Sequence, residues 1–169
     1  MKKRSARFVV HAAVIAALYA AVTHLQNILL PGSASMAIQM RISEALCVLA
    51  FFTPAAIPGL SIGCLVFNLT YAGTLPLDFL VGTLATYLAA QGMWLTRNRT
   101  VKGYPVLGML LPALSNAILV GWELAVYIGG GFLLNAVYVA IGEAVVLLVL
   151  GTALYYALKR RSLAEKLFS

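Results

Sequence analysis

Charged residues are scarce in this chain of 169 residues: only 10% are Asp, Glu, Lys or Arg, whereas 62% are hydrophobic. Soluble globular domains are usually about half apolar and about a quarter charged. So few charges exclude an ordinary water-exposed surface, and lipid is the expected solvent. A β-barrel is also excluded, because its strands would alternate apolar and polar residues, whereas these apolar runs are long and nearly continuous. The sequence therefore predicts an all-α integral membrane protein.

The chain also lacks the motifs of common catalytic and nucleotide-binding sites. It contains no phosphate-binding loop, nucleophile elbow, HExxH motif or Cys–His zinc pattern. Its two cysteines, Cys47 and Cys64, lie in separate apolar runs without CxxC spacing. That placement is typical of buried small side chains rather than of a disulfide or a metal site. We therefore expect no enzymatic activity, no bound metal and no cofactor of its own.

Turn residues divide the apolar sequence into six stretches, most of them of roughly the length that one membrane-spanning helix needs. The second and third are short for full spans, so we expect the turn between them, at Pro54 to Pro58, to lie partly in the membrane interface. No segment is long enough for a soluble domain, and residues 1–169 are predicted to form one membrane domain. The expected helices cover residues 8–30, 38–53, 55–71, 77–95, 105–128 and 132–158.

Positive charge gathers before the first expected helix, between the fourth and fifth, and after the sixth, and accounts for a net charge of +7. Basic residues mark cytoplasmic loops. With six helices and a cytoplasmic N-terminus, all three segments fall on the cytoplasmic side, as does the C-terminus. The charge thus indicates orientation, and we expect no nucleic-acid partner. The basic residues are Lys2, Lys3, Arg4 and Arg7, then Arg97, Arg99 and Lys102, then Lys159, Arg160, Arg161 and Lys166.

Five other charged residues, apart from the C-terminal Glu165, fall in the outer half of the predicted bundle. A charge at the bilayer centre costs about 2.5–3.5 kcal/mol, so such residues are candidates for function. Carboxamides and aromatic rings occur at similar depth, and together they predict an outward-facing pocket for a small polar molecule. The excess of acids over one arginine favours a cationic or donor-rich substrate. The candidates are Arg41, Glu44, Asp78, Glu123 and Glu143, with Asn68, Asn116, Asn135, Trp122 and Tyr138.

Some of these residues also have ordinary structural explanations. Asp78 could cap the N-terminus of its helix, and Arg41 and Glu44 could pair with each other at i, i+3 spacing. Exposed Trp and Tyr side chains often anchor a helix at the membrane interface. A purely interfacial role suits Glu123 and Glu143 less well, because Glu143 lies about ten residues into its helix, roughly 15 Å deep.

Small residues line the first expected helix in two rows at i, i+4 spacing, which lets helices approach closely in lipid. This pattern predicts a flat face for another helix, within the chain or in another subunit. The rows are Ala12, Ala16 and Ala20, and Ala13, Ala17 and Ala21.

Several sequence blocks, taken as a set, resemble a known family over nearly the whole chain. With the six helices and the alanine rows, they are similar to a substrate-binding component (S-component) of an energy-coupling-factor (ECF) transporter. The closest resemblance is to the QueT family of queuosine-precursor transporters. The blocks are RISEAL at 41–46, the segment 54–68 with Gly59, Gly63, Cys64 and Asn68, the segment 78–86, the segment 116–123, and Gly142 with Glu143.

The resemblance implies a multi-pass protein of the bacterial plasma membrane that binds its substrate from outside. It implies docking, through the alanine rows, on a membrane coupling protein that carries two ATPase subunits, so that ATP is used by partners and not by this chain. The implied substrates are queuine and 7-aminomethyl-7-deazaguanine. Glu123 or Glu143 would bind the base edge and Asn116 and Asn135 would add hydrogen bonds, while residues 41 and 44 would brace or gate the pocket.

Three other functions remain open at the level of sequence. The chain could be an S-component for another vitamin. It could be a proton-coupled secondary transporter that uses Glu123 or Glu143, which would work without any ATPase. It could also be a purely structural membrane subunit, in which the outer carboxylates would serve stability alone.

Overall fold

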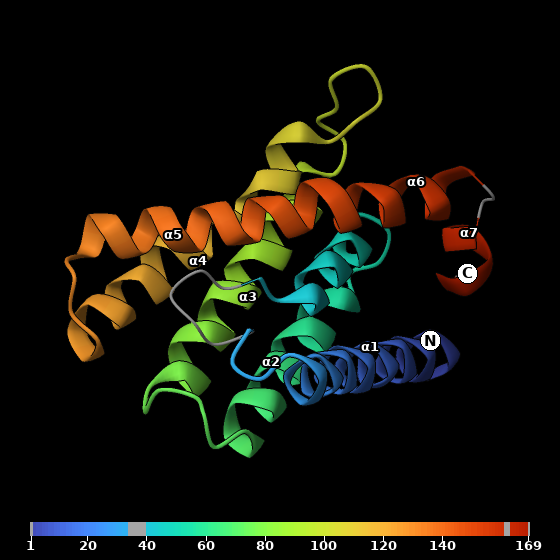
Figure 1. The fold of residues 1–169 in the computed structure, drawn as a ribbon. Helices are drawn as coiled ribbons and strands as arrows, with labels where there is room; N and C mark the ends of the chain where they lie inside the picture. Colours follow the sequence, from blue (N-terminus) through green and yellow to red (C-terminus); the bar gives the residue numbers. More distant parts are fainter. Residues whose placement is uncertain (1, 34–39, 161–162, 169) are drawn as a thin grey trace.

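The computed structural model describes residues 2–33, 40–160 and 163–168, and every regular element within these ranges is a helix (Figure 1). The all-α prediction is therefore confirmed. The elements are α1 (Lys2–Leu29), the 3₁₀-helix η1 (Ile42–Phe51), α2 (Ala56–Thr70), α3 (Asp78–Thr96), α4 (Val106–Tyr127), α5 (Phe132–Val146), the π-helix η2 (Leu147–Gly151), α6 (Thr152–Arg160) and α7 (Leu163–Phe168).

Each expected helix range corresponds to an observed helix, with two differences in kind. The range 38–53 contains a 3₁₀-helix that begins at Ile42, and residues 38 and 39 of that range lie outside the described residues. The range 132–158 is a rod of three consecutive segments, α5, η2 and α6, which crosses the whole molecule in Figure 1.

Three of the described helical stretches are long and apolar enough to cross a membrane: Ala6–Leu29, Val106–Tyr127 and Phe132–Arg160. At about 1.5 Å per residue, each exceeds the roughly 30 Å of a bilayer core. Ile42–Phe51 and Ala56–Thr70 are apolar but shorter. The chain is therefore a membrane protein, and the two short helices pack among the longer ones.

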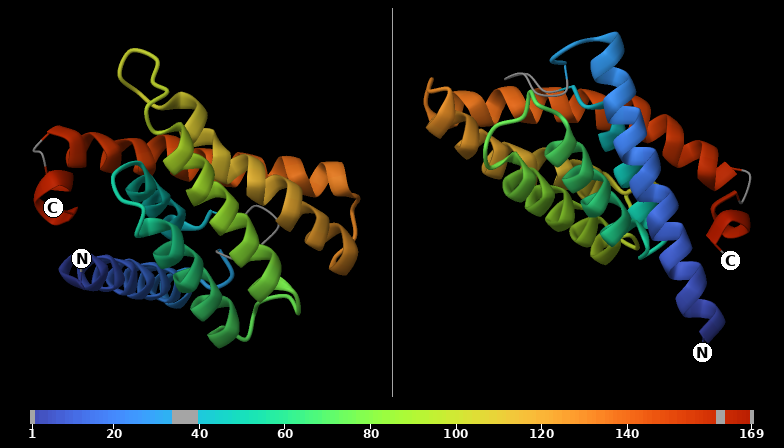
Figure 2. Two further views of the ribbon diagram at one scale, coloured as in Figure 1. Left: turned by 180° about the vertical axis from the view of Figure 1, so that it is seen from behind. Right: turned by 90° about the horizontal axis from the view of Figure 1, so that it is seen from below.

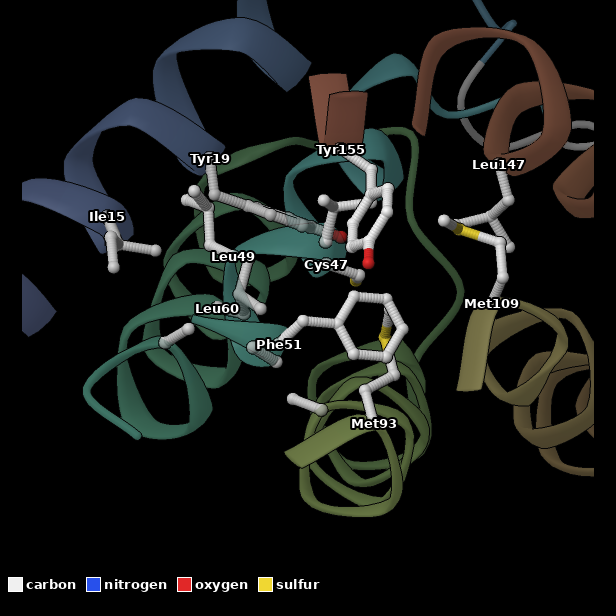
Figure 3. Close-up of a cluster of buried hydrophobic side chains, with 14 of the residues drawn as sticks. Ile15, Tyr19, Cys47, Leu49, Phe51, Leu60, Met93, Met109, Leu147 and Tyr155 are labelled. Carbon is white, nitrogen blue, oxygen red and sulfur yellow. The ribbon is translucent and has the colours of Figure 1, made fainter. Parts of the chain in front are cut away.

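The element at the centre of the bundle is η1, which packs against each of α1 to α6 (Figure 1). Long 3₁₀-helices are uncommon, because their hydrogen-bond geometry is poorer than that of an α-helix. Eight of the ten residues of η1 are buried. Figure 3 shows one part of the core around its C-terminal end, where Phe51 lies among Met93, Tyr155 and Met109.

Helices α1 and α2 approach each other closely through small residues. A Cβ atom added to Gly63 would lie 2.8 Å from the carbonyl oxygen of Ala16 and 2.7 Å from Cβ of Tyr19. Gly59 meets the carbonyl oxygen of Ala12 in the same way, at 2.8 Å. Small residues four apart allow this kind of contact between helices in lipid.

Contacts join the three segments that carry most of the basic residues, and both ends of the chain lie on the same side of the molecule (Figure 2). The ring of Phe168 in α7 packs edge-on against His11 of α1, with centroids 5.5 Å apart. The ammonium group of Lys159 in α6 donates to the carbonyl oxygen of Gly103 in the α3–α4 loop at 2.9 Å. These contacts hold the three segments together.

Candidate functional site

Eight of the ten predicted substrate-binding residues are buried inside the bundle. They come from η1 or its N-cap, α2, α3, α4 and α5, so the fold brings together side chains that are far apart in sequence. The eight are Arg41, Glu44, Asn68, Asp78, Asn116, Glu123, Asn135 and Glu143. The structure does not bring in the other two: Trp122 is 49% exposed and Tyr138 is 36% exposed. Trp122 precedes the buried Glu123 in the chain and Tyr138 precedes the buried Val139, but both aromatic side chains lie on the outer face of their helices.

Glu44 is the most completely bonded of the buried carboxylates. Its Oε1 accepts a hydrogen bond from the hydroxyl of Tyr19 in α1, and its Oε2 accepts one from the thiol of Cys47, one turn later in η1, at 3.1 Å. A carboxylate buried in an apolar interior needs such donors, because unpaired burial of a charge is costly. Glu44 therefore ties η1 to α1.

The end of α1 fixes where η1 begins. The hydroxyl of Thr23 donates to the hydroxyl of Ser43 at 2.6 Å, and Oε1 of Gln26 accepts a hydrogen bond from the backbone N–H of Ile42 at 2.8 Å. The polar face of α1 thus holds the first turn of η1, and with it Arg41 and Glu44, in place.

The guanidinium group of Arg41 lies between η1 and α2. Its Nη1 donates to Sγ of Cys64 at 3.6 Å, and its Cζ lies 5.4 Å from the centre of the Phe67 ring. Cation–π contacts of this kind stabilise a buried cation. Arg41 also interacts electrostatically with Glu143 of α5 and with Glu123 of α4.

Asn68 and Asp78 join the start of α3 to α2. Nδ2 of Asn68 donates to the backbone carbonyl oxygen of Asp78 at 2.8 Å and to Sγ of Cys64 at 3.5 Å. Asp78 is the first residue of α3, and the N-cap of the helix is Leu77. Its Oδ2 instead accepts the backbone N–H of Leu75 at 2.7 Å, so the carboxylate closes the turn before the helix.

Two of the buried carboxylates have oxygen atoms without a hydrogen-bond partner in the described part of the chain. Glu123 is fully buried, and neither of its oxygens has a hydrogen-bond partner among the residues that the structure describes. Its nearest charged neighbour in electrostatic terms is Asp78. Glu143 is 2% exposed, and within the described ranges its Oε2 is also without a partner. Buried polar groups are normally bonded, so these oxygens are exceptions among the buried polar atoms of the described residues.

The two other carboxamides differ in their roles. Nδ2 of Asn135 donates to the carbonyl oxygens of Gly129 and Gly131, at 2.7 and 3.1 Å. It braces the three-glycine loop before α5, whose glycines all have positive φ values. Asn116 is buried on α4 seven residues before Glu123, which places both on the same face of the helix.

We name the connected residues the polar cluster. Three of its members, Tyr19, Cys47 and Cys64, were not among the predicted site residues. The sequence does contain a pattern that indicates Tyr19. Residues 19, 23, 26 and 27 follow helical spacing, and their four polar side chains lie on one buried face of α1. The polar cluster consists of Tyr19, Arg41, Glu44, Cys47, Cys64, Asn68, Asp78, Glu123 and Glu143.

A groove of about 340 Å³ lies between the end of α1 and the α5–η2 junction. Its lining is almost entirely apolar and includes Ile42 and Val149, which are 40% and 62% exposed. Among the described residues, no member of the polar cluster lines this groove.

The two alanine rows of α1 face in different directions. Ala12, Ala16 and Ala20 are buried, and the first two lie against the glycines of α2. This row is used within the chain. Ala13, Ala17 and Ala21 are exposed, so only they are available to another subunit.

Comparison with protein families gives one match: the family model described as QueT transporter matches residues 9–160 of this chain. Neither the curated proteins nor the solved structures contain a match. The matched range contains every residue of the polar cluster and both alanine rows.

Proposed function

The chain belongs to the QueT transporter family, and we propose that it is the substrate-binding membrane subunit of an ECF-type, ATP-driven importer of a queuosine precursor. The observation that carries the proposal is the pair of buried carboxylates, Glu123 and Glu143, that have oxygens without partners in the described part of the chain. A transport role, rather than catalysis, follows from the family.

The substrate class in this proposal is a 7-deazaguanine, queuine or 7-aminomethyl-7-deazaguanine. Such a base offers adjacent N–H donors, which a carboxylate accepts in bidentate fashion, and a carbonyl oxygen, which a guanidinium or amide N–H can bind. The polar cluster contains both kinds of group, with Arg41 electrostatically coupled to Glu143. Its four carboxylates against one guanidinium also favour a cationic ligand over an anionic one.

The proposed topology has six spans in a bacterial cell membrane, with both termini in the cytoplasm. It is supported by the contacts that join the three basic segments, because the positive-inside rule places such segments on the same side of the membrane. The polar cluster would then open to the outside.

The proposed partners are a membrane coupling protein and two ATPase subunits, which would use ATP on behalf of this chain. Helix α1 would dock through Ala13, Ala17 and Ala21, the row that internal packing leaves exposed. Small residues at this spacing give a flat surface on which a partner helix can lie in lipid.

Ligand binding by isothermal calorimetry on the detergent-purified chain tests this function. The panel is queuine, 7-aminomethyl-7-deazaguanine, guanine, riboflavin, thiamine and biotin. We expect one-to-one binding of a deazaguanine that is weakened in Glu143→Gln. The matched control is Glu165→Gln, which neutralises the only acid outside the polar cluster and should bind as the wild type does. Binding of a vitamin in place of every deazaguanine would overturn the substrate assignment. No binding by a folded sample would overturn the proposal as a whole.

A further inference from the structure

A pocket of about 480 Å³ lies between the N-terminal part of α1, the turn that joins η1 to α2, and α7. The ring of Phe168 in α7 packs against His11 of α1, so α7 forms one wall of this pocket (Figure 2). Within the described residues, no member of the polar cluster lines it, so it is distinct from the candidate substrate site. The lining consists of Arg7, Phe8 and His11, residues 53–55, and Phe168.

The polar side chains of this pocket are hydrogen-bond donors. A guanidinium carries five N–H groups, so Arg7 can bind an oxyanion and still keep a contact with the chain. The imidazole of His11 carries at least one N–H, and its edge-on packing against Phe168 holds the ring in place. Among the described residues, no Asp or Glu lines the pocket. This combination favours an anion with several oxygen atoms, such as a phosphate group.

Thr53 adds a buried hydroxyl group whose proton has no acceptor among the described residues. Its side chain lines the pocket and is only 5% exposed. Its Oγ1 accepts the backbone N–H of Ala55 at 3.3 Å, which holds the hydroxyl at the turn before α2. Buried polar groups normally use their hydrogen-bonding capacity, and an oxygen atom of a bound anion would accept this proton.

The sequence around Arg7 is basic. Lys2, Lys3 and Arg4 precede it, and the membrane-spanning stretch of α1 begins at Ala6. A cluster of four basic residues next to a spanning helix attracts anionic lipids, and basic pockets between spanning helices bind phospholipid head groups. The charge therefore favours a phosphate group that belongs to a membrane lipid.

The rest of the lining is apolar and adjoins a surface that faces acyl chains. Phe8 lines the pocket and is 41% exposed, and the next two residues of α1, Val9 and Val10, are more exposed still. A free phosphate ion would gain nothing from apolar walls. A phospholipid would place its glycerol and its first acyl carbons against them, which removes apolar surface from water.

We propose that this pocket binds the phosphate group of an anionic phospholipid through Arg7, His11 and Thr53. The bound lipid connects α1 to the turn before α2 and to α7. In the proposed topology the lipid belongs to the cytoplasmic leaflet. Its binding does not depend on which substrate the protein carries, because the two sites share no residue of the described chain.

Native mass spectrometry of the detergent-purified full chain tests this site. The probes are dioctanoyl phosphatidylglycerol, dioctanoyl phosphatidylcholine and inorganic phosphate. We expect the wild type to bind one phosphatidylglycerol about tenfold more tightly than phosphatidylcholine, because the choline group brings a second cation close to Arg7. Inorganic phosphate should compete only weakly, because it has no apolar part.

Substitutions in the pocket should weaken this binding selectively. Arg7→Gln should lower the affinity for phosphatidylglycerol by about tenfold, because it removes a charge-assisted hydrogen bond. The matched control, Arg99→Gln, removes the same charge from the exposed α3–α4 loop and should bind as the wild type does. Thr53→Val should lower the affinity by about fivefold, and Thr53→Ser, which keeps the hydroxyl, should restore it. If Arg7→Gln does not fold, as judged by thermal unfolding, the two Thr53 variants decide the test.

Four results would overturn the proposal. Equal affinity for the two lipids would show that the site does not select an anionic head group. Equal losses in Arg7→Gln and Arg99→Gln would indicate attraction by overall positive charge. Displacement of the lipid by an equal concentration of inorganic phosphate would make this a site for the free ion. Unchanged lipid binding in both Arg7→Gln and Thr53→Val, with loss of assembly with the partner subunits, would make the pocket a protein contact.

Discussion

Substituting alanine for Gly63 should separate α1 from α2 and destabilise the protein. The new Cβ atom would lie 2.8 Å from the carbonyl oxygen of Ala16 and 2.7 Å from Cβ of Tyr19. Neither atom can rotate away, because one belongs to the backbone and the other is fixed to it. Helix α1 would have to move by about 0.6 Å to bring the 2.8 Å contact to an ordinary one of about 3.4 Å.

The cost can be estimated against a matched control, Gly92→Ala in α3. There the nearest atom to the new Cβ is the terminal Cδ1 of Leu111, at 2.8 Å, which a rotamer change can move. Both substitutions gain up to about 1 kcal/mol of helix propensity, but only Gly63→Ala suffers overpacking of about 1–3 kcal/mol. We therefore expect Gly63→Ala to be about 2 kcal/mol less stable than Gly92→Ala.

Thermal unfolding of both variants in the same detergent, followed by circular dichroism, measures this difference. For a chain of this size about 2 kcal/mol corresponds to roughly 4–8 °C in Tm. The displaced Tyr19 would also hold Glu44 less well, so ligand affinity should fall in Gly63→Ala alone. If the Tm of Gly63→Ala equals or exceeds that of Gly92→Ala, the close approach of α1 and α2 is not what limits substitution at this site.

Two further predictions concern α1. Ala17→Leu, on the exposed alanine row, should leave ligand binding unchanged and abolish ATP-dependent uptake in vesicles that contain the partner subunits. Ala16→Leu, on the buried row, should instead lower the Tm of the isolated chain. Normal uptake by Ala17→Leu would contradict the proposed docking surface. Tyr19→Phe removes one of the two hydrogen bonds to Glu44 and should destabilise the protein by about 1–3 kcal/mol. Thermal unfolding measures this loss, and an unchanged Tm would show that Cys47 alone satisfies that carboxylate.

Much of the fold follows from the sequence because the strongest signals in it are long. Apolar stretches separated by Pro and Gly predict helices at the observed places, and the all-α class is confirmed. The resemblance to the QueT family is confirmed by the family match. The sequence does not predict the 3₁₀ winding of η1. Whether residues 42–51 adopt a 3₁₀- or an α-helix depends on packing against seven other helical elements, and a local pattern does not contain that information.

The sequence indicates the acidic residues of the candidate site more clearly than its other members. Charges are rare in an apolar chain, so Glu123 and Glu143 are conspicuous in the sequence, and both prove to be buried. Trp122 is grouped with them because aromatic rings occur at similar depth, but its side chain is 49% exposed, since adjacent residues of a helix face different directions. Asn135 is predicted to contact the ligand, and the structure shows that its amide nitrogen also donates to the glycine loop beside it. Which polar group meets the backbone and which meets another helix is decided in three dimensions.

The 3₁₀ winding of η1 determines which side chains can line up along it. With three residues per turn, positions three apart lie directly above one another. Arg41 at the N-cap, Glu44 and Cys47 therefore form a column along one edge of the helix. In an α-helix each step of three residues falls about 60° short of a full turn, so residues 41 and 47 would be about 120° apart. The same ten residues would also shorten from about 20 Å to about 15 Å. Rewinding η1 as an α-helix would therefore disperse the column and turn Cys47 away from the edge that carries Arg41.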